Sequence, residues 1–326
     1  MDRQATSSRT RMGGGVNTRA LVAMVVTLLF WASAFAGIRV GLAGYPPGAL
    51  VLLRFLIASL ALIVYALITR MRLPAWRDMP AILLQGFLGI GVYQITLAFG
   101  EQTVSAGAAS LLIASVPCFT ALLATLFLGE RLTRWGWIGI VGSFAGVAVI
   151  SAGLQGGLHF SLDALLILVG ACSEAIYFIW QKRYMRKYSG IELAIYAIWS
   201  ATLFMLVFAP QLWHALSHAP MNATLTIVYL GLFPAALAYV TWSFVLSQAS
   251  ASITTSFLNI SPILSFVIAW LWIGEAPSLV SIIGGLVVVL GVLLINTKGR
   301  RRAPGLAVAA QEVEMPHSSK IKVGGQ

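Results

Sequence analysis

The sequence contains one short motif twice, in LLATLFLGERLTR at residues 122–134 and in VIAWLWIGEAPSL at residues 267–279. Both copies end an apolar run with Gly-Glu, and aligning them also pairs Pro117 with Pro262. The matches continue into the apolar segments that follow, where isoleucine, glycine and valine recur at the same spacing. The sequence therefore predicts an internal repeat, in which two copies of one structural unit make up most of the chain.

Composition decides the class of protein. The chain of 326 residues is 59% apolar and 10% charged, with a mean hydropathy of +0.89. Soluble domains are about 45–50% apolar and roughly 25% charged. Apolar runs of about 20 residues, each long enough to cross a hydrocarbon core of roughly 30 Å, recur along nearly all of this chain. We therefore expect an all-α integral membrane protein.

The apolar runs predict ten transmembrane helices. The expected spans are residues 18–41, 48–69, 80–100, 106–128, 135–153, 163–181, 190–209, 222–246, 252–273 and 277–296. Five spans fall in a first repeat, residues 18–153, and five in a second repeat, residues 162–297. The tails, residues 1–17 and 298–326, are polar and are expected to be disordered and cytoplasmic.

The basic residues outside the spans all lie on one side of this topology. With the N-terminus in the cytoplasm, every Lys and Arg outside the spans falls in a tail or in the loop after span two, four or six. Such a bias follows the positive-inside rule and places both termini in the cytoplasm. The net charge of +11 is therefore a topology signal, and no nucleic-acid partner is expected.

Five is an odd number of spans, so the second repeat must enter the membrane inverted relative to the first. In the first copy the Gly-Glu motif then faces the cytoplasm, and Arg131 follows it. In the second copy the motif faces the outside, and Ala276 follows it. Two inverted five-helix repeats related by a pseudo-two-fold axis are typical of secondary transporters, which bind substrate near the midplane between the repeats.

Longer motifs carry a resemblance to a known family. They are FWASAFAGIRVGL at 30–42, PPGALVLLRF at 46–55, GEQTVSAGAASLLIASVP at 100–117 with GERL at 129–132, and the weaker second copy SQASASITTSFLNISP at 247–262. The chain resembles the EamA-like branch of the drug/metabolite transporter superfamily. The resemblance implies a ten-helix exporter in the bacterial inner membrane that moves amino acids or other small metabolites out of the cell. The second copy departs from the family pattern because no Arg-Leu follows its Gly-Glu.

Ionisable residues within the spans are candidate functional groups, because each costs roughly 2.5–3.5 kcal/mol to insert. Glu174, in GACSEAIYFIW, is expected near the midplane, where it binds a proton, binds a substrate ammonium, or forms a salt bridge with Arg54 that fixes helix packing. Arg54 either holds a helix end or meets a substrate carboxylate. Arg39 is expected to snorkel to the outer surface. Glu101 matches a family motif, and this resemblance implies that it lines the outer mouth.

Aromatic residues are the next candidates for the binding cavity. Tyr93 and Tyr239 occupy equivalent positions in the two repeats and are placed to stack on a ligand ring or ammonium group. Trp31, Tyr177 and Trp242 either line the same cavity or belong to the aromatic belt at the membrane surface.

Two prolines interrupt equivalent spans of the repeats. Pro117 in span four and Pro262 in span nine each remove a backbone hydrogen bond and kink the helix. These kinks are either hinges for alternating access or purely structural. Asn259 and Ser261, beside the second kink, either line a polar path or serve close helix packing.

Glycines in spans five and ten predict close packing of these two helices. Gly142 and Gly146 lie in the first and Gly284 and Gly291 in the second, where small residues let backbones approach. A dimer face is the less favoured use of the same glycines. The sequence leaves both a monomer and a weak dimer open.

These observations predict a secondary transporter that exports small organic metabolites, amino acids in particular, by alternating access. A broad-specificity drug exporter is the nearest alternative. No phosphate-binding loop of the G-x-x-x-x-G-K-S/T type occurs, and His214 and His218 lack a third ligand nearby, so neither ATP, a cofactor nor a metal is expected. A passive channel would lack the paired kinks, and an enzyme would need catalytic groups gathered at one depth. The expected partners are a small-molecule substrate and the lipid bilayer.

Single cysteines test the inverted topology. Cysteines placed at Gly44, Ser217 or Ser278 should react with an impermeant thiol reagent in intact cells, because the charge bias puts these positions outside. Cysteines placed at Ser7 or Ser189 should react only after lysis. If position 278 is labelled only after lysis, the second repeat is not inverted.

Overall fold

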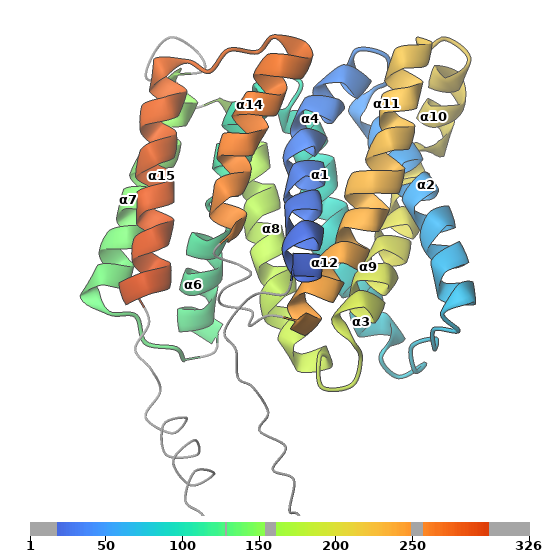
Figure 1. The fold of residues 1–326 in the computed structure, drawn as a ribbon, viewed down its shortest axis with the longest axis horizontal. Coiled ribbons are helices and arrows are strands. Elements are labelled where there is room, and N and C mark those ends of the chain that lie inside the picture. The colour runs from blue at the N-terminus through green and yellow to red at the C-terminus, as the bar shows by residue number, and fades with distance from the viewer. Residues whose placement is uncertain (1–17, 128, 154–160, 249–256, 300–326) are drawn as a thin grey trace, which may run out of the picture.

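A computed structural model describes residues 18–127, 129–153, 161–248 and 257–299, and these residues form a bundle of long helices (Figure 1). The predicted tails, except for Lys298 and Gly299, lie outside the described residues. So does the beginning of the expected span nine. Among the described residues, nine helices are long and apolar enough to cross a membrane, and Phe257–Ile273 forms a shorter apolar one. This confirms the expectation of a ten-helix membrane protein.

The first repeat contains the elements up to Gly153. They are α1 (Thr18–Leu42), α2 (Pro47–Ile68), α3 (Met79–Gly86), η1 (Phe87–Val92), α4 (Tyr93–Gly100), α5 (Ala106–Ile113), α6 (Val116–Phe127) and α7 (Arg134–Gly153). The second repeat contains α8 (Leu162–Tyr184), α9 (Gly190–Met205), η2 (Leu206–Phe208), α10 (Ala209–Leu216), α11 (Met221–Leu232), η3 (Phe233–Leu237), α12 (Ala238–Gln248), η4 (Phe257–Ile260), α14 (Ser261–Ile273) and α15 (Leu279–Lys298).

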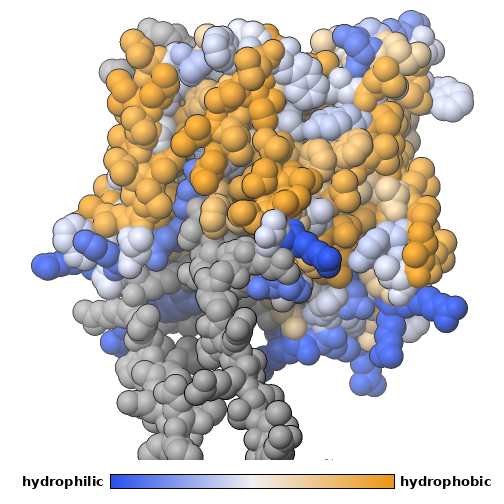
Figure 2. All heavy atoms as spheres, in the orientation of Figure 1, coloured by the Kyte–Doolittle hydropathy of each residue, from blue (hydrophilic) through white to orange (hydrophobic). Residues whose placement is uncertain are grey.

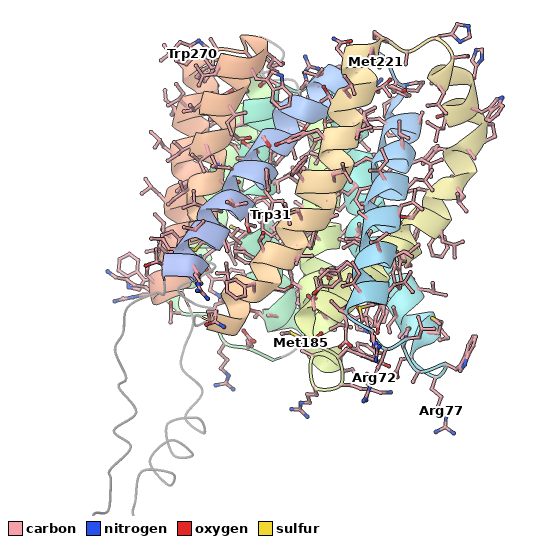
Figure 3. The ribbon with its side chains drawn as sticks, turned by 45° about the vertical axis from the view of Figure 1, so that its right-hand side comes forward. Trp31, Arg72, Arg77, Met185, Met221 and Trp270 are labelled. Atoms are coloured by element: carbon pink, nitrogen blue, oxygen red, sulfur yellow. The ribbon has the colours of Figure 1, made fainter. Side chains whose placement is uncertain are left out.

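The path of the chain shows the inversion of the second repeat. Helix α1 begins, and α15 ends, at the lower end of the bundle in Figure 1, which we call the terminal end. Figure 3 shows Arg72, Arg77 and Met185 at this end and Met221 and Trp270 at the opposite, distal end. Helix α8 begins at the distal end, where the Asp163 carboxylate accepts a hydrogen bond from the Thr103 hydroxyl at 2.5 Å. The first helices of the two repeats therefore run in opposite directions.

A broad apolar band covers the face of the bundle seen in Figure 2, and hydrophilic side chains gather at its terminal end. Many large apolar side chains of the described residues are exposed, among them Leu60, Val141 and Leu290. A soluble protein rarely exposes a continuous apolar surface of this size. The band is the surface that contacts the lipid chains.

The two repeats interlock through their first helices. Helix α1 packs against α11, α12 and α14 of the second repeat, and α8 packs against α4, α5 and α6 of the first. Side-chain hydrogen bonds reinforce the first of these contacts. They run from Ser265 Oγ to the Ala32 carbonyl (2.9 Å), between the Thr27 and Thr241 hydroxyls (2.6 Å), and between the Ser33 and Tyr229 hydroxyls (2.7 Å). The space between the repeats is therefore walled by helices of both.

The repeated Gly-Glu motif forms the same backbone turn in both copies. Gly129 and Gly274 adopt left-handed φ angles of +66° and +71°, which a residue with a Cβ atom adopts only with strain. In each copy the following glutamate N–H bonds back to a helical carbonyl at 3.3 Å, from Glu130 to Ala124 and from Glu275 to Ala269. The motif is thus a glycine C-cap, whose backbone N–H groups donate hydrogen bonds to carbonyls in the last turns of α6 and α14.

Helices α7 and α15 pack together along their glycines, as the sequence predicts. A Cβ atom added to Gly146 would lie 2.5 Å from the Gly284 carbonyl oxygen, and one added to Gly139 would lie 2.6 Å from that of Gly291. The expected role of Gly142 was wrong, because an added Cβ there meets nothing within 4 Å. Gly139 and Gly146 are seven residues, about two turns, apart and share one face, whereas Gly142 points elsewhere.

Span seven extends beyond its predicted end at residue 209. The helix continues through η2 and α10 to Leu216, which places His214 within a helix rather than in a loop. Pro210 stands in the first turn of α10, where a missing N–H costs no helical hydrogen bond, and so does not end the helix. The rings of His214 and His218 lie 5.2 Å apart, and no group of three metal-ligating residues occurs among the described residues.

A pair of glycine variants tests the α7–α15 contact. Gly146→Leu should destabilise the protein by about 1–3 kcal/mol, because its side chain would be forced into the backbone of α15. Gly142→Leu, one turn away on the same helix, should have little effect. Thermal unfolding of both variants in detergent measures the difference, and equal melting temperatures would contradict the close contact.

Candidate functional site

A short π-helical segment interrupts the same span in each repeat. The segments are η1, Phe87–Val92, and η3, Phe233–Leu237, and they lie just before Tyr93 and Tyr239 respectively. π-Helical turns are rare and occur frequently at functional sites. The two tyrosines predicted to be equivalent therefore follow equivalent distortions of the backbone.

Helix α8 packs directly on the first of these segments. Ser173 Oγ donates a hydrogen bond of 2.5 Å to the Leu88 carbonyl, which satisfies a backbone group within the π-helical segment. A Cβ atom on Gly89 would lie 2.3 Å from the Cβ atom of Tyr177, so only glycine lets α8 approach this closely. The π-helical segment and Gly89 together fix the position of the α8 turn that carries Glu174.

The Glu174 carboxyl lies among tyrosines from both repeats. Tyr93 from α4, Tyr177 from α8 and Tyr239 from α12 all lie within electrostatic range of this carboxyl. Glu174 itself is partly exposed, whereas Tyr93 and Tyr177 are buried. Neither of the two ion pairs among the described residues includes Glu174, so the interpretation of a salt bridge to Arg54 finds no support.

Aromatic side chains extend this cluster toward α1. The Trp31 ring lies 5.6 Å from the Tyr239 ring and 5.2 Å from the Trp242 ring. Figure 3 shows Trp31 at middle height between the two ends of the bundle. The structure thus brings together Trp31, Tyr93, Glu174, Tyr177, Tyr239 and Trp242, which we call the central cluster.

Arg54 lies beside the central cluster but binds another partner. Its Nη1 donates to Gln94 Oε1 at 3.0 Å, its guanidinium carbon lies 5.5 Å from the centroid of the Phe55 ring, and only 4% of its surface is exposed. The Nε donor is buried with no hydrogen-bond partner among the described residues. Tyr93 and Tyr239 are within electrostatic range of this cation. Arg54 therefore holds a side-chain amide rather than a helix end, and one of its donors is unused.

The segments at the two predicted kinks are irregular. A break separates α5 from α6 at residues 114–115, just before Pro117, and the described part of span nine begins with the 3-10 turn η4, just before Pro262. Asn259 lies in η4, and Ser261 begins α14. Both side chains are partly exposed, and their place on a polar path stays a prediction. The role of the prolines as hinges stays a prediction.

A second polar cluster closes the distal end. Arg39 Nε pairs with Glu275 Oε1 at 2.9 Å, and Arg39 Nη1 donates to the backbone carbonyls of Glu101 and Gln102 at 2.6 and 3.0 Å. Glu275 Oε2 accepts the Ala106 N–H at the first turn of α5, at 2.9 Å. Arg39, which was expected to snorkel to the outer surface, is partly exposed and reaches a carboxylate of the other repeat. We call Arg39, Glu275 and Glu101 the distal cluster.

Glu101 is the fully buried member of the distal cluster. None of its surface is exposed, and neither carboxyl oxygen has a hydrogen-bond partner among the described residues. Burial raises the pKa of this carboxyl well above its usual range, an effect that nearby Arg39 and Arg54 oppose and Glu275 reinforces. The outer-mouth position that the family motif implied thus holds a carboxyl shielded from solvent in this conformation.

Sequence reasoning missed Gln94, Ser173, Gly89 and Glu275 as parts of these clusters. The repeated Gly-Glu motif contained the signal for Glu275, since a glutamate that recurs at the end of a helix must find a partner or remain in water. The partners of Ser173 and Gln94 lie far away in the sequence, and nothing in the local pattern indicates them.

Comparison with known proteins decides the family. The model of the EamA-like transporter family matches residues 18–152 and again residues 162–297, which together cover most of the chain. The chain belongs to the EamA-like transporter family. It is therefore a multi-pass membrane transporter and not an enzyme.

Relatives of this EamA-like protein carry transporter names. It is 48% identical to the transporter YdfC of Bacillus subtilis over 82% of this chain and 88% of the relative. It is 41% identical to a protein of Streptantibioticus cattleyicolor named "Probable terminal-alkyne amino-acid exporter", over 87% and 96%. The inner membrane transporter YedA of Escherichia coli is 27% identical over 90% and 95%. A solved crystal structure with 20% identity superposes with a TM-score of 0.58, covering 92% of this chain and all of the other, and shares the fold.

Two glycines of the π-helical segment η1 provide a matched test of the site's framework. Gly89→Ala should push α8 away, lower stability by about 1–3 kcal/mol and displace the central cluster, because the new methyl group overlaps Tyr177. Gly91→Ala should be tolerated, since its Cβ would make ordinary contacts of 3.6 Å or more. Thermal unfolding and tryptophan fluorescence distinguish the two, and identical behaviour would contradict the close contact of α8 with η1.

Proposed function

We propose that this transporter exports small amphipathic metabolites, and amino acids in particular, from the bacterial cytoplasm by alternating access. The observation that carries the proposal is the Glu174 carboxyl at the contact between the repeats, among three tyrosines and near two tryptophans. Inverted-repeat transporters bind their substrates at this depth and at this contact.

The chemistry of the central cluster matches an amino acid. A substrate ammonium would bind the Glu174 carboxylate and the faces of the surrounding aromatic rings. A substrate carboxylate would bind Arg54, whose Nε donor has no partner among the described residues. Trp31 and Trp242 would contact an apolar side chain. The relative named as a terminal-alkyne amino-acid exporter supports the same class of substrate.

The orientation in the membrane follows from the basic residues. The terminal end, with Arg72 and Arg77, would face the cytoplasm, and the distal cluster would face the outside. The Arg39–Glu275 pair joins the two repeats at the distal end, so the described conformation would be closed to the outside, and the Lys187–Asp78 pair joins them at the terminal end. Reorientation of the repeats about the segments before Pro117 and Pro262 would open the distal end. Transport would be driven by the proton gradient or by the solute's own gradient.

The same cluster favours one rival substrate class. A carboxylate surrounded by aromatic rings also suits large organic cations, which would make the protein a broad-specificity drug exporter. Such a cation has no carboxylate and needs no contact with Arg54. An amino acid needs both charged residues.

Counterflow into proteoliposomes tests the proposal. Labelled propargylglycine, a terminal-alkyne amino acid, should exchange in the unmodified protein, and Glu174→Gln should slow the exchange by at least about tenfold, because it removes a charge-assisted contact. Glu130→Gln, on a loop at the terminal end, is the matched control and should exchange normally. Loss of all exchange would indicate ammonium binding, whereas exchange that continues but no longer responds to a pH gradient would indicate proton coupling.

Two results would refute the amino-acid assignment. One is wild-type exchange in a stably folded Glu174→Gln protein, which would remove the central cluster from the binding site. The other is transport of a cationic dye such as ethidium with no amino-acid exchange, and unaffected by Arg54→Gln. That second result would establish the drug exporter instead.

A further inference from the structure

The distal cluster contains two carboxyl groups, and its cation, Arg39, forms an ion pair with only one of them. Arg39 is engaged with the Glu275 carboxylate and with two backbone carbonyls, those of Glu101 and Gln102. The Glu101 carboxyl lies beside this group, fully buried, with both oxygens lacking a partner among the described residues. An ionised carboxylate buried without hydrogen bonds is strongly unfavourable, so in the closed conformation this group holds a proton.

We propose that Glu101 is a proton-binding site and that closure of the distal end takes up a proton there. The inference rests on the proposed alternating access and on the outward orientation of the distal end. When the distal end opens, Glu101 meets external water and releases its proton to it. When the end closes, the carboxylate must recover a proton from the same side before it can be buried.

The charged groups around Glu101 explain how this proton controls the closure. Arg39 approaches from α1 and Arg54 from α2, and Glu275 approaches from the turn after α14. Asp163 on α8 is the remaining acid at this end, and the Thr103 hydroxyl is hydrogen-bonded to it. An ionised Glu101 would compete with Glu275 for Arg39. Once protonated, it leaves Arg39 to Glu275, and the ion pair between the repeats forms.

The terminal end has its own ion pair between the repeats, Lys187 with Asp78, but among the described residues it shows no buried carboxyl without a hydrogen-bond partner. Glu130 is the counterpart of Glu275 in the repeat, and it takes part in neither ion pair of the described residues. Aligning Gln102 with Gln248 places Ser247 at the position of Glu101, so the second repeat has no acid there. The proton site therefore belongs to one end of the transporter only, and it gives the two otherwise similar ends different responses to pH.

The direction of the effect follows from proton linkage. Glu101 has its ordinary pKa in the open state and a raised pKa in the closed state. At pH values between these two pKa values, the closed state binds one more proton than the open state. In this window the ratio of closed to open molecules should fall by up to about tenfold per pH unit as the external pH rises. Acid outside should therefore close the distal end.

Spin-label distances measure this ratio without relying on transport. Labels on Ala43→Cys, after α1, and Ala276→Cys, after α14, would sit on exposed positions on either side of the Arg39–Glu275 pair, in a protein whose Cys118 and Cys172 are replaced by alanine. Double electron–electron resonance in nanodiscs, over about pH 5 to 9 and without substrate, should show the short distance giving way to a longer one as pH rises.

Three variants assign the response. Glu101→Gln, which imitates the protonated acid, should keep the short distance at every pH. Glu275→Gln should favour the long distance and move the midpoint to lower pH, because Arg39 is then free to pair with ionised Glu101. Glu130→Gln, the matched control from the other repeat, should respond like the unmodified protein.

A distance distribution that does not change with pH in the unmodified protein would overturn the proposal, as would an unchanged response in Glu101→Gln. If Glu101→Gln does not fold, the Glu275→Gln midpoint decides, and an unshifted midpoint refutes the role of Glu101. Because the measurement uses no substrate, a failure of amino-acid exchange would refute the proposed substrate and leave this result standing.

Discussion

The constraint that governs this molecule is that hydrocarbon offers no partner to a backbone N–H or C=O group. Each span must therefore bond its own backbone, and a break is tolerated only where another part of the protein supplies the missing partner. The π-helical segment before Tyr93 meets this condition because Ser173 binds the Leu88 carbonyl. The π-helical segment η1 thus lies at the contact between the repeats, where a polar side chain of α8 supplies the partner that its backbone needs.

Duplication of one unit in opposite orientations gives identical backbone elements different surroundings. Both copies of the Gly-Glu motif cap a helix through a left-handed glycine and an equivalent backbone hydrogen bond. At the distal end the glutamate side chain reaches Arg39 and the first turn of α5. Its counterpart stands in a loop whose neighbours are arginines. The same backbone turn therefore has an ion-pair partner at the distal end and arginine neighbours in the sequence at the other.

The features that could be predicted from the sequence are those that depend on local pattern. Apolar runs predict the spans, loop charges predict their direction, and the recurring Gly-Glu motif predicts the inverted repeats. These predictions are possible because insertion into lipid depends on each segment separately. Tyr93, Tyr239 and Glu174 could be selected by repeat equivalence and by their depth. The Arg39–Glu275 pair, the burial of Glu101 and the π-helical segments could not, since each depends on contacts between residues far apart in the chain. The end of span seven was misplaced because Pro210 begins a new helical turn instead of ending one.

The glycine contact between α7 and α15 has the form of an interface between two copies of one chain. Gly139 meets Gly291 and Gly146 meets Gly284, while the repeat alignment makes Gly139 equivalent to Gly284 and Gly146 to Gly291. Each side therefore presents the same patch to the other, which is the isologous pairing of a two-fold symmetric dimer. A free five-helix copy would associate with an inverted copy of itself through this patch, and fusion of two such genes would need to add only a linker. The contact between the last helices of the two halves therefore has the reciprocal geometry of a subunit interface within a single chain.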